Sequence, residues 1–246
     1  MRRYMNADLS RIYSRKPRII ILLIFFILCA VNCIFSASAA TSMASLASDC
    51  LNTVGLVCTI FGVIEIVYVY GDDFKAKTIQ VAIGTGIKRQ KIVHAKLLEY
   101  MICVFTDIVI ATVITVVCAI ITKGMTGNLY VSDVIVFVFI EWFKVVAALA
   151  TSMFLMYIGE GIIATLLAYL LLAGGVITSV IQLLAPLAGL SELHLHTYTL
   201  SSQVSTLQAR LELGYLNWVS LLIILLHMMF GFALASILFK NKELEF

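Results

Sequence analysis

The stretch Ile19–Phe35 reads IIILLIFFILCAVNCIF and contains no charged residue. A helix that crosses the hydrocarbon core of a bilayer needs about 20 predominantly apolar residues, so this stretch and its neighbours predict a membrane span. The whole chain has the same character, since 62% of its 246 residues are hydrophobic, 13% are charged and its mean hydropathy is +1.05. A soluble domain is about 45–50% apolar and about 25% charged. The sequence therefore predicts an integral membrane protein.

Further apolar stretches of similar length predict an all-α fold with six transmembrane helices in a single permease-like domain that covers residues 1–246. Pro17 suits the first turn of the first span, and Pro186 is expected to end the fifth. The predicted spans cover about residues 19–36, 51–70, 97–121, 134–157, 162–185 and 215–239.

The N-terminal segment before the first span is basic and amphipathic. Residues 4–16 mix apolar side chains with Arg and Lys, which predicts a short helix that lies in the membrane interface. A basic stretch, an apolar run and the small residues 36–40 also resemble a signal peptide. The apolar run exceeds the about 7–15 residues of a usual signal core, so we expect a first span that is retained.

The distribution of Lys and Arg predicts the orientation in the membrane. With six spans, fourteen of these residues lie on one side, in the N-terminal segment, the loop after the second span and the tail, and only Lys123 and Arg210 lie on the other side. Loops rich in Lys and Arg remain in the cytoplasm. We therefore expect a multi-pass plasma-membrane protein with both termini and residues 71–96 in the cytoplasm.

The loop after the second span has two predicted helical parts. Residues 71–99 read GDDFKAKTIQVAIGTGIKRQKIVHAKLLE. Asp72 and Asp73 favour a helix start, which predicts a short helix over Phe74–Ile83 that Gly84-Thr85-Gly86 breaks. The next helix climbs into the third span, and its long basic side chains are expected to snorkel to lipid headgroups. These basic residues are Lys88, Arg89, Lys91 and Lys96.

The same loop resembles that of a known family. Its acidic pair, Lys-Thr pair, apolar stretch, Gly followed by Arg, and Lys at the base of the next span are similar to the first cytoplasmic loop of bacterial type-two ABC permeases. The small permeases that export bacitracin or lantibiotics from Gram-positive membranes are the most similar, although Lys88 stands where Ser is commoner. The residues that carry the resemblance are Asp72, Asp73, Lys77, Thr78, Gly86, Arg89, Lys91 and Lys96.

The resemblance implies a function. The loop would be a coupling helix seated in a cleft of a separate ATP-binding-cassette ATPase, and a second copy or a related permease would complete the transporter. The substrate would be a peptide antibiotic or an amphipathic, lipid-like molecule, exported from a bacterium in antibiotic resistance or immunity. The implied ATPase contacts are Asp72, Asp73, Phe74, Lys77, Thr78, Ile79, Ile83 and Arg89.

The chain is not expected to be an enzyme. It lacks a G-x-x-x-x-G-K-[ST] phosphate-binding loop, so ATP and Mg²⁺ would bind the partner ATPase and this chain would hold no cofactor. Lipid, rather than nucleic acid, is its other expected partner. Three alternatives stay open: an ion-gradient-driven secondary carrier or other polytopic membrane protein, a membrane anchor for a signalling partner, and a loop that is merely solvated and basic.

Charged residues inside the predicted spans are candidates for a transport path, because each costs roughly 2.5–3.5 kcal/mol at mid-bilayer. Glu141 and Lys144 are spaced i, i+3 and form either a structural pair or a substrate contact. Glu65 lies about 9 Å of helix from Gly71, near the expected cytoplasmic interface. Asp107 lies deeper, and it either bonds to a neighbouring helix or lines the path.

The cysteines and histidines predict no metal or disulfide. Five of the six cysteines lie in apolar runs without CxxC spacing, and we expect them to be packing residues. His194 and His196 supply two ligands, whereas zinc usually requires three or four protein ligands. In the outer segment before the last span, Val204, Leu207 and Leu211 repeat at helical spacing, which predicts a short capping helix.

Overall fold

The structure is a computed structural model that describes residues 2–39, 43–71, 78–123, 131–159, 161–187, 189, 193–212 and 214–241. Within these residues the fold is all-helical, with 91% helix and no strand. Five helices are long and apolar enough to cross a membrane, and a bent pair, α9 and α10, makes a sixth span if the two are counted as one. The prediction of an all-α fold is confirmed, and these five to six candidate spans are compatible with the predicted multi-pass membrane protein.

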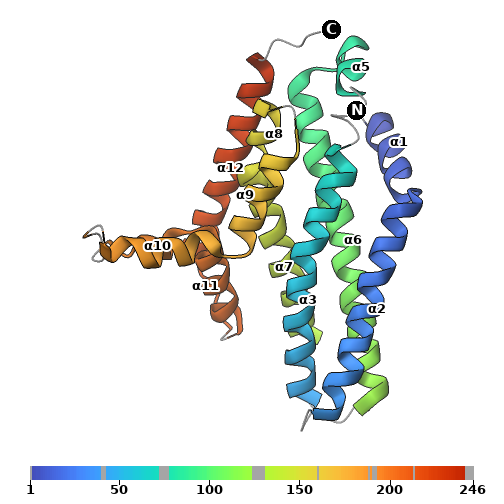
Figure 1. The fold of residues 1–246 in the computed structure, drawn as a ribbon, viewed down its shortest axis with the longest axis vertical. Coiled ribbons are helices and arrows are strands. Elements are labelled where there is room, and N and C mark those ends of the chain that lie inside the picture. Colours follow the sequence, from blue (N-terminus) through green and yellow to red (C-terminus); the bar gives the residue numbers. More distant parts are fainter. Residues whose placement is uncertain are drawn as a thin grey trace.

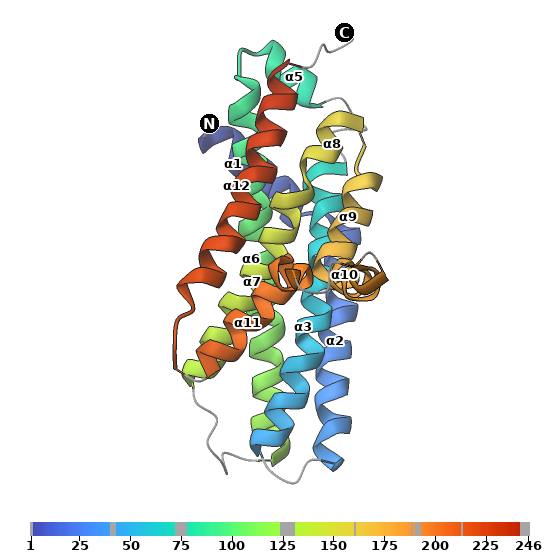
Figure 2. The same ribbon diagram turned by 90° about the vertical axis from the view of Figure 1, so that its left-hand side faces the viewer.

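The long helices form an elongated bundle in which α2, α3, α6 and α7 run side by side (Figures 1 and 2). The first half of the chain contains α1 (Arg2–Tyr13), α2 (Lys16–Ala39), α3 (Met43–Ile66), a π-helical turn η1 (Val67–Gly71), α5 (Thr78–Gly84) and α6 (Arg89–Lys123). The second half contains α7 (Val131–Ser152), α8 (Phe154–Gly159), α9 (Ile163–Ala173), α10 (Val176–Leu187), the 3₁₀ turn η3 (Leu195–Tyr198), α11 (Leu200–Glu212) and α12 (Trp218–Asn241).

Helix α1, helix α5 and the C-terminal end of α12 lie at the same end of the bundle (Figure 1). Helix α6 has 35 residues, which corresponds to about 50 Å of helix and exceeds the about 30 Å of a bilayer core. Its Arg89 end lies at the end of the bundle that carries α5 (Figure 1).

The predicted fifth span is wrong as a continuous helix. Instead of one helix over 162–185, α9 and α10 meet at a bend of 69°. Gly174 caps α9, and Gly175 follows with φ +72°, a left-handed conformation that glycine adopts without strain. At 11 and 12 residues, each part is too short to cross a bilayer alone. Helix α10 projects sideways from the bundle, and Pro186 lies inside it rather than ending it (Figure 1).

Small residues let the two halves approach closely. A Cβ on Gly231 of α12 would lie 2.5 Å from the Cα of Thr151, so the backbones of α12 and α7 are in direct contact there. Gly62 of α3 provides similar room for two buried tyrosines, and the Tyr169 hydroxyl donates to the Thr59 carbonyl at 3.0 Å. Because lipid provides no hydrophobic drive between helices, such close contacts are a main source of stability.

Candidate functional site

All four charged residues that were predicted for a transport path take part in ion pairs, and the first cluster joins α2, α3 and α6. The Arg18 guanidinium donates from Nε to Glu65 at 2.7 Å and from one terminal nitrogen to both Asp107 oxygens at 3.1 Å. All three residues are at most 3% exposed. The Tyr13 ring lies 4.8 Å from the guanidinium carbon, and the Tyr13 hydroxyl is hydrogen-bonded to Thr106. Residues distant in sequence thus hold three helices together; we call Arg18, Glu65 and Asp107 the triad.

The triad provides evidence on the roles that the sequence left open for Asp107 and Glu65. Asp107 pairs with a residue of a neighbouring helix, which favours its structural interpretation over a path lining. Glu65 is fully buried against Arg18 rather than near solvent. One feature of the sequence could have indicated this ion pairing: Arg18 directly precedes a long apolar run. The orientation argument treated Arg18 only as one of the basic residues of the N-terminal segment.

A second ionic cluster ties α1 to α6. Lys96 pairs with Asp8 and, at 3.0 Å, with Glu99, while Arg11 pairs with Asp8 at 2.5 Å. Lys96 is 0% exposed, so the prediction that it snorkels to headgroups is wrong. Its Nζ finds carboxylates inside the protein instead, and it also donates to the Val69 carbonyl at 3.4 Å.

Two groups at the α1 end titrate abnormally because of this packing. Partial burial alone would raise the pKa of the Asp8 carboxyl, but the positive charge and hydrogen bond of Lys96, aided by Arg11, hold it below the ordinary value of 3.8. Burial raises the pKa of Tyr13 to about 12. Asp8 is therefore ionised over the whole neutral range, as its pairing with two cations requires.

A further ion pair, between Glu141 and Lys144, faces a cavity. Glu141 and Lys144, one turn apart on α7, form the i, i+3 ion pair that their spacing predicts. They face a cavity of about 430 Å³, which we call the polar cavity. Helix α3, the break between α9 and α10, and α11 form its other walls. Its lining residues are Leu51, Asn52, Gly55, Leu56, Thr59, Ile60, Phe137, Glu141, Lys144, Ala173, Gly174 and Gln208.

Local sequence explains why the cavity exists. Phe137, Glu141 and Lys144 are spaced i, i+4 and i+7, so they lie on one face of α7. Opposite them, α3 places Gly55, where an added Cβ would lie 3.4 Å from a Glu141 oxygen. The missing side chain leaves room for the carboxylate, and Ala173 and Gly174, at the bend between α9 and α10, line the cavity.

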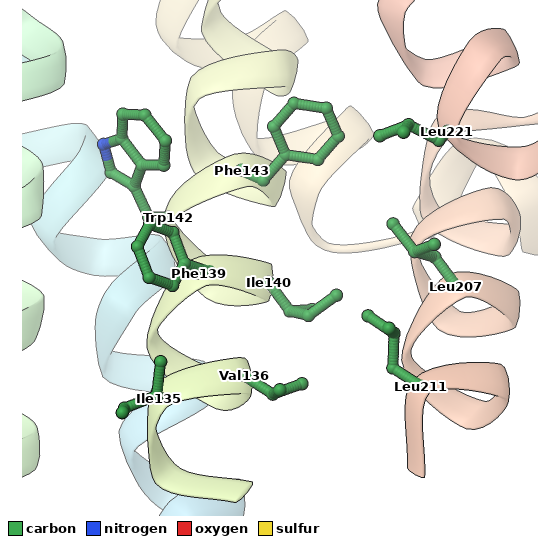
Figure 3. A pocket seen from close by; sticks show the side chains of 9 residues that line it. All are labelled: Ile135, Val136, Phe139, Ile140, Trp142, Phe143, Leu207, Leu211 and Leu221. Atoms are coloured by element: carbon green, nitrogen blue, oxygen red, sulfur yellow. The ribbon is translucent and has the colours of Figure 1, made fainter. Parts of the chain in front are cut away.

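A second, apolar pocket of about 240 Å³ lies on the neighbouring face of α7. Figure 3 shows Val136 and Ile140 of α7 directed toward Leu207 and Leu211 of α11, with Phe143 directed toward Leu221 of α12. Ile135, Phe139 and Trp142 complete its lining. Helix α11 contributes Leu207 and Leu211 to the apolar pocket and Gln208 to the polar cavity, so this predicted capping helix stands between the two.

The residues predicted to contact an ATPase are only partly described. Asp72, Asp73, Phe74 and Lys77 lie outside the described residues, and Thr78 begins α5. Ile79 is 5% exposed and Ile83 packs against the core, so both face this chain. The exposed apolar side chain of α5 is that of Val81, at 66%.

Arg89 joins the start of α6 to the end of α12. Its Nη1 donates to the carbonyls of Phe239 and Lys240 at 3.3 Å each, and its guanidinium carbon lies 5.9 Å from the centre of the Phe239 ring. This places Arg89 beside α12, at the same end as α5.

No group of three or more potential metal ligands occurs in the part of the chain that the structure describes. The six cysteines, all within described helices, are free thiols. The rings of His194 and His196 lie 6.2 Å apart in the segment before α11. No protein-family model matches the chain, and no curated protein matches it significantly.

Proposed function

We propose that this chain is the membrane permease subunit of an exporter that moves a peptide antibiotic or another amphipathic, lipid-like substrate, with energy from a separate ATP-binding-cassette ATPase. The observation that carries the proposal is the polar cavity. It places an ion pair and three neutral polar side chains, Asn52, Thr59 and Gln208, among apolar walls between helices of membrane-spanning length.

Burying polar groups in such a cavity costs free energy, and a simple membrane anchor has no need of a polar cavity. Polar groups inside a membrane protein mark pathways and binding sites, because apolar side chains would fill the same space at lower cost. Broken helices are tolerated at membrane depth where they are buried in protein or line a cavity, as the α9–α10 break does. A transporter uses both features.

The ATP-driven part of the proposal rests on the end of the bundle that carries α5. The loop before α5 resembles a coupling helix, and α5 presents Val81 to solvent beside the ends of α6 and α12. The concentration of Lys and Arg at this end suits the cytoplasmic side of a bacterial plasma membrane, where ATP is available. A second copy or a related permease would complete the transporter.

The secondary-carrier alternative gains less support. It would use Glu65 and Asp107 to bind the driving ion, yet both carboxylates already contact Arg18. A driving ion would therefore compete with a buried guanidinium for these carboxylates.

The test is co-purification of the tagged chain from its native membranes, followed by identification of a bound Walker-motif ATPase and measurement of ATP hydrolysis. Val81→Asp should reduce the bound ATPase and its activity while the chain stays folded, because Val81 is solvent-exposed. Ser205→Asp, the matched control, adds the same charge at an exposed position of α11, away from α5, and should leave both unchanged. A chain that purifies without any ATPase, or a Val81→Asp variant that binds it normally, would contradict the ATP-driven proposal.

A further inference from the structure

The charge balance of the polar cavity selects among ligands. It contains one carboxylate, on Glu141, and one ammonium, on Lys144, and these two pair with each other. A ligand with a single charge could pair with only one of them and would leave the other uncompensated in a medium of low dielectric constant, which is strongly unfavourable. A zwitterion can pair with both, because its cation replaces Lys144 at Glu141 while its anion binds Lys144.

The neutral polar groups fit the same ligand. Asn52 and Thr59 of α3 and Gln208 of α11 line the cavity with hydrogen-bonding side chains. Amide and hydroxyl donors are suited to the oxygens of a phosphodiester, which accept several hydrogen bonds at once.

An apolar chain attached to this headgroup has a place nearby. The apolar pocket lies on the next face of α7, on the other side of α11, and its nine lining residues are all apolar or aromatic (Figure 3). At the rim of the polar cavity, Leu56 is 73% exposed and Ile60 is 38% exposed on α3. Because both residues are apolar, exposed and on a helix of membrane-spanning length, we expect them to face lipid, which would let a membrane amphiphile reach the cavity sideways.

We propose that the polar cavity is a site for the zwitterionic headgroup of a phospholipid, of the phosphoethanolamine or phosphocholine kind, with an acyl chain in the apolar pocket between α7 and α11. This inference deepens the proposed function by naming the class of amphiphile, and it rests on that function only for the claim that the bound lipid is a transport substrate. The binding itself requires no ATPase.

The test uses a tryptophan that the pocket already contains. Trp142 lines the apolar pocket, and Trp218→Phe removes the second tryptophan, so that excitation selective for tryptophan reports on Trp142 alone. The purified chain is placed in bilayers with phospholipids whose acyl chains are brominated and quench tryptophan on contact. Phosphatidylethanolamine and phosphatidylglycerol with the same brominated chains are compared at equal mole fraction, so non-specific contact with the bilayer is equal in both.

Brominated phosphatidylethanolamine should quench Trp142 with an apparent association about five-fold stronger than phosphatidylglycerol, the ratio that one typical net hydrogen bond provides. The double variant Glu141→Gln with Lys144→Met removes both charges together, leaves neither unpaired, and should abolish this preference. Gly55→Leu fills the cavity and should do the same. Gly84→Leu, at a position with no atom within 4 Å of an added Cβ, is the matched control and should keep the preference.

Three results would overturn the proposal. Equal quenching by the two lipids would remove headgroup selection, and stronger quenching by phosphatidylglycerol would make Lys144 an anion site. Displacement of the brominated lipid by a cationic amphipathic peptide, at concentrations where neutral peptides do not compete, would make a peptide the occupant. Because no ATPase is present, these results are independent of the co-purification test.

Discussion

The two sides of this molecule use buried charge in opposite ways. At the triad, which joins α2, α3 and α6, each charged residue pairs with a residue of a different helix. On the side of α7, Glu141 and Lys144 pair within one helix and face open space. A pair shared between helices fixes their packing, whereas a pair within one helix can open to a ligand without moving any helix.

The largest expected effect comes from breaking the triad. Arg18→Met leaves two buried carboxylates without their cation and should lower the free energy of unfolding in detergent by about 3–5 kcal/mol. The triple variant Arg18→Met, Glu65→Gln and Asp107→Asn leaves no buried charge and should recover most of this loss. Denaturant titrations of the two variants measure the difference, and a triple variant as unstable as Arg18→Met would show that the triad is not primarily an ion-pair link.

Asp107→Asn tests the remaining functional interpretation of the triad. Arg18 keeps Glu65 as a partner in this variant, so the chain should fold with moderately reduced stability and bind its ATPase normally. If export is unchanged at the same time, the residue is structural. Reduced export from a folded, ATPase-bound variant would return Asp107 to the transport path and weaken the contrast between the two sides.

A smaller effect is expected at Asp8, on the same side of the molecule. Because the folded-state pKa of Asp8 lies below its ordinary value of 3.8, its contribution is present above that pH and is lost as the pH falls through the lower, folded-state value. Asp8→Asn should cost about 2 kcal/mol at neutral pH, the typical size of a charge-assisted hydrogen bond.

Measuring the free energy of unfolding as a function of acid pH distinguishes the contribution of Asp8 from a general effect of removing a carboxylate. Asp8→Asn should show a shallower loss of stability than the unmodified chain as the pH falls below about 4. Asp49→Asn, the same substitution at an exposed position of α3, should leave the profile unchanged. Parallel acid profiles for Asp8→Asn and the unmodified chain would separate Asp8 from the Lys96 cluster.

The break between α9 and α10 provides a test on the cavity side. Gly175 has φ +72°, and an added Cβ would lie 3.0 Å from the Ser201 hydroxyl oxygen. Gly175→Ala should therefore destabilise the fold by about 1–2 kcal/mol, measured by the same denaturant titration. Gly84→Ala, at the last residue of α5 with open space and no positive φ, should not destabilise the fold and should stabilise it by at most about 1 kcal/mol. A neutral Gly175→Ala would mean that the bend is not held by glycine.

Much of the fold could be predicted from the sequence, because span length and hydropathy are local properties. The helices near 19–36, 97–121 and 215–239 needed only apolar runs of sufficient length. The prediction of a continuous fifth span was wrong because hydropathy carries no information about the direction of the backbone. A Gly174-Gly175 pair inside an apolar run permits a bend, but whether the bend forms depends on what packs against it.

The candidate site was harder to predict, because ion pairs depend on which helices are neighbours. The Glu141–Lys144 pair follows from spacing along a single helix. The pairing of Arg18 with Glu65 and Asp107 joins positions 47 and 89 residues apart, and no local pattern contains that information. Lys96 is an intermediate case, because its pairing with Glu99 follows from i, i+3 spacing whereas its pairing with Asp8 of α1 spans 88 residues.

The smallest stability effect is expected at the pair that matters most for function. An i, i+3 pair on one helix contributes about 0.2–0.5 kcal/mol, so the double variant Glu141→Gln with Lys144→Met should unfold almost as the unmodified chain does. Glu141→Gln alone should be less stable than the double variant, because it leaves Lys144 without its carboxylate. The same double variant should lose the preference of Trp142 quenching for zwitterionic lipid. Denaturant titration and quenching on one preparation measure both properties. A double variant that loses as much stability as Arg18→Met would show that charge has the same structural role at both places, whatever the quenching result says about binding.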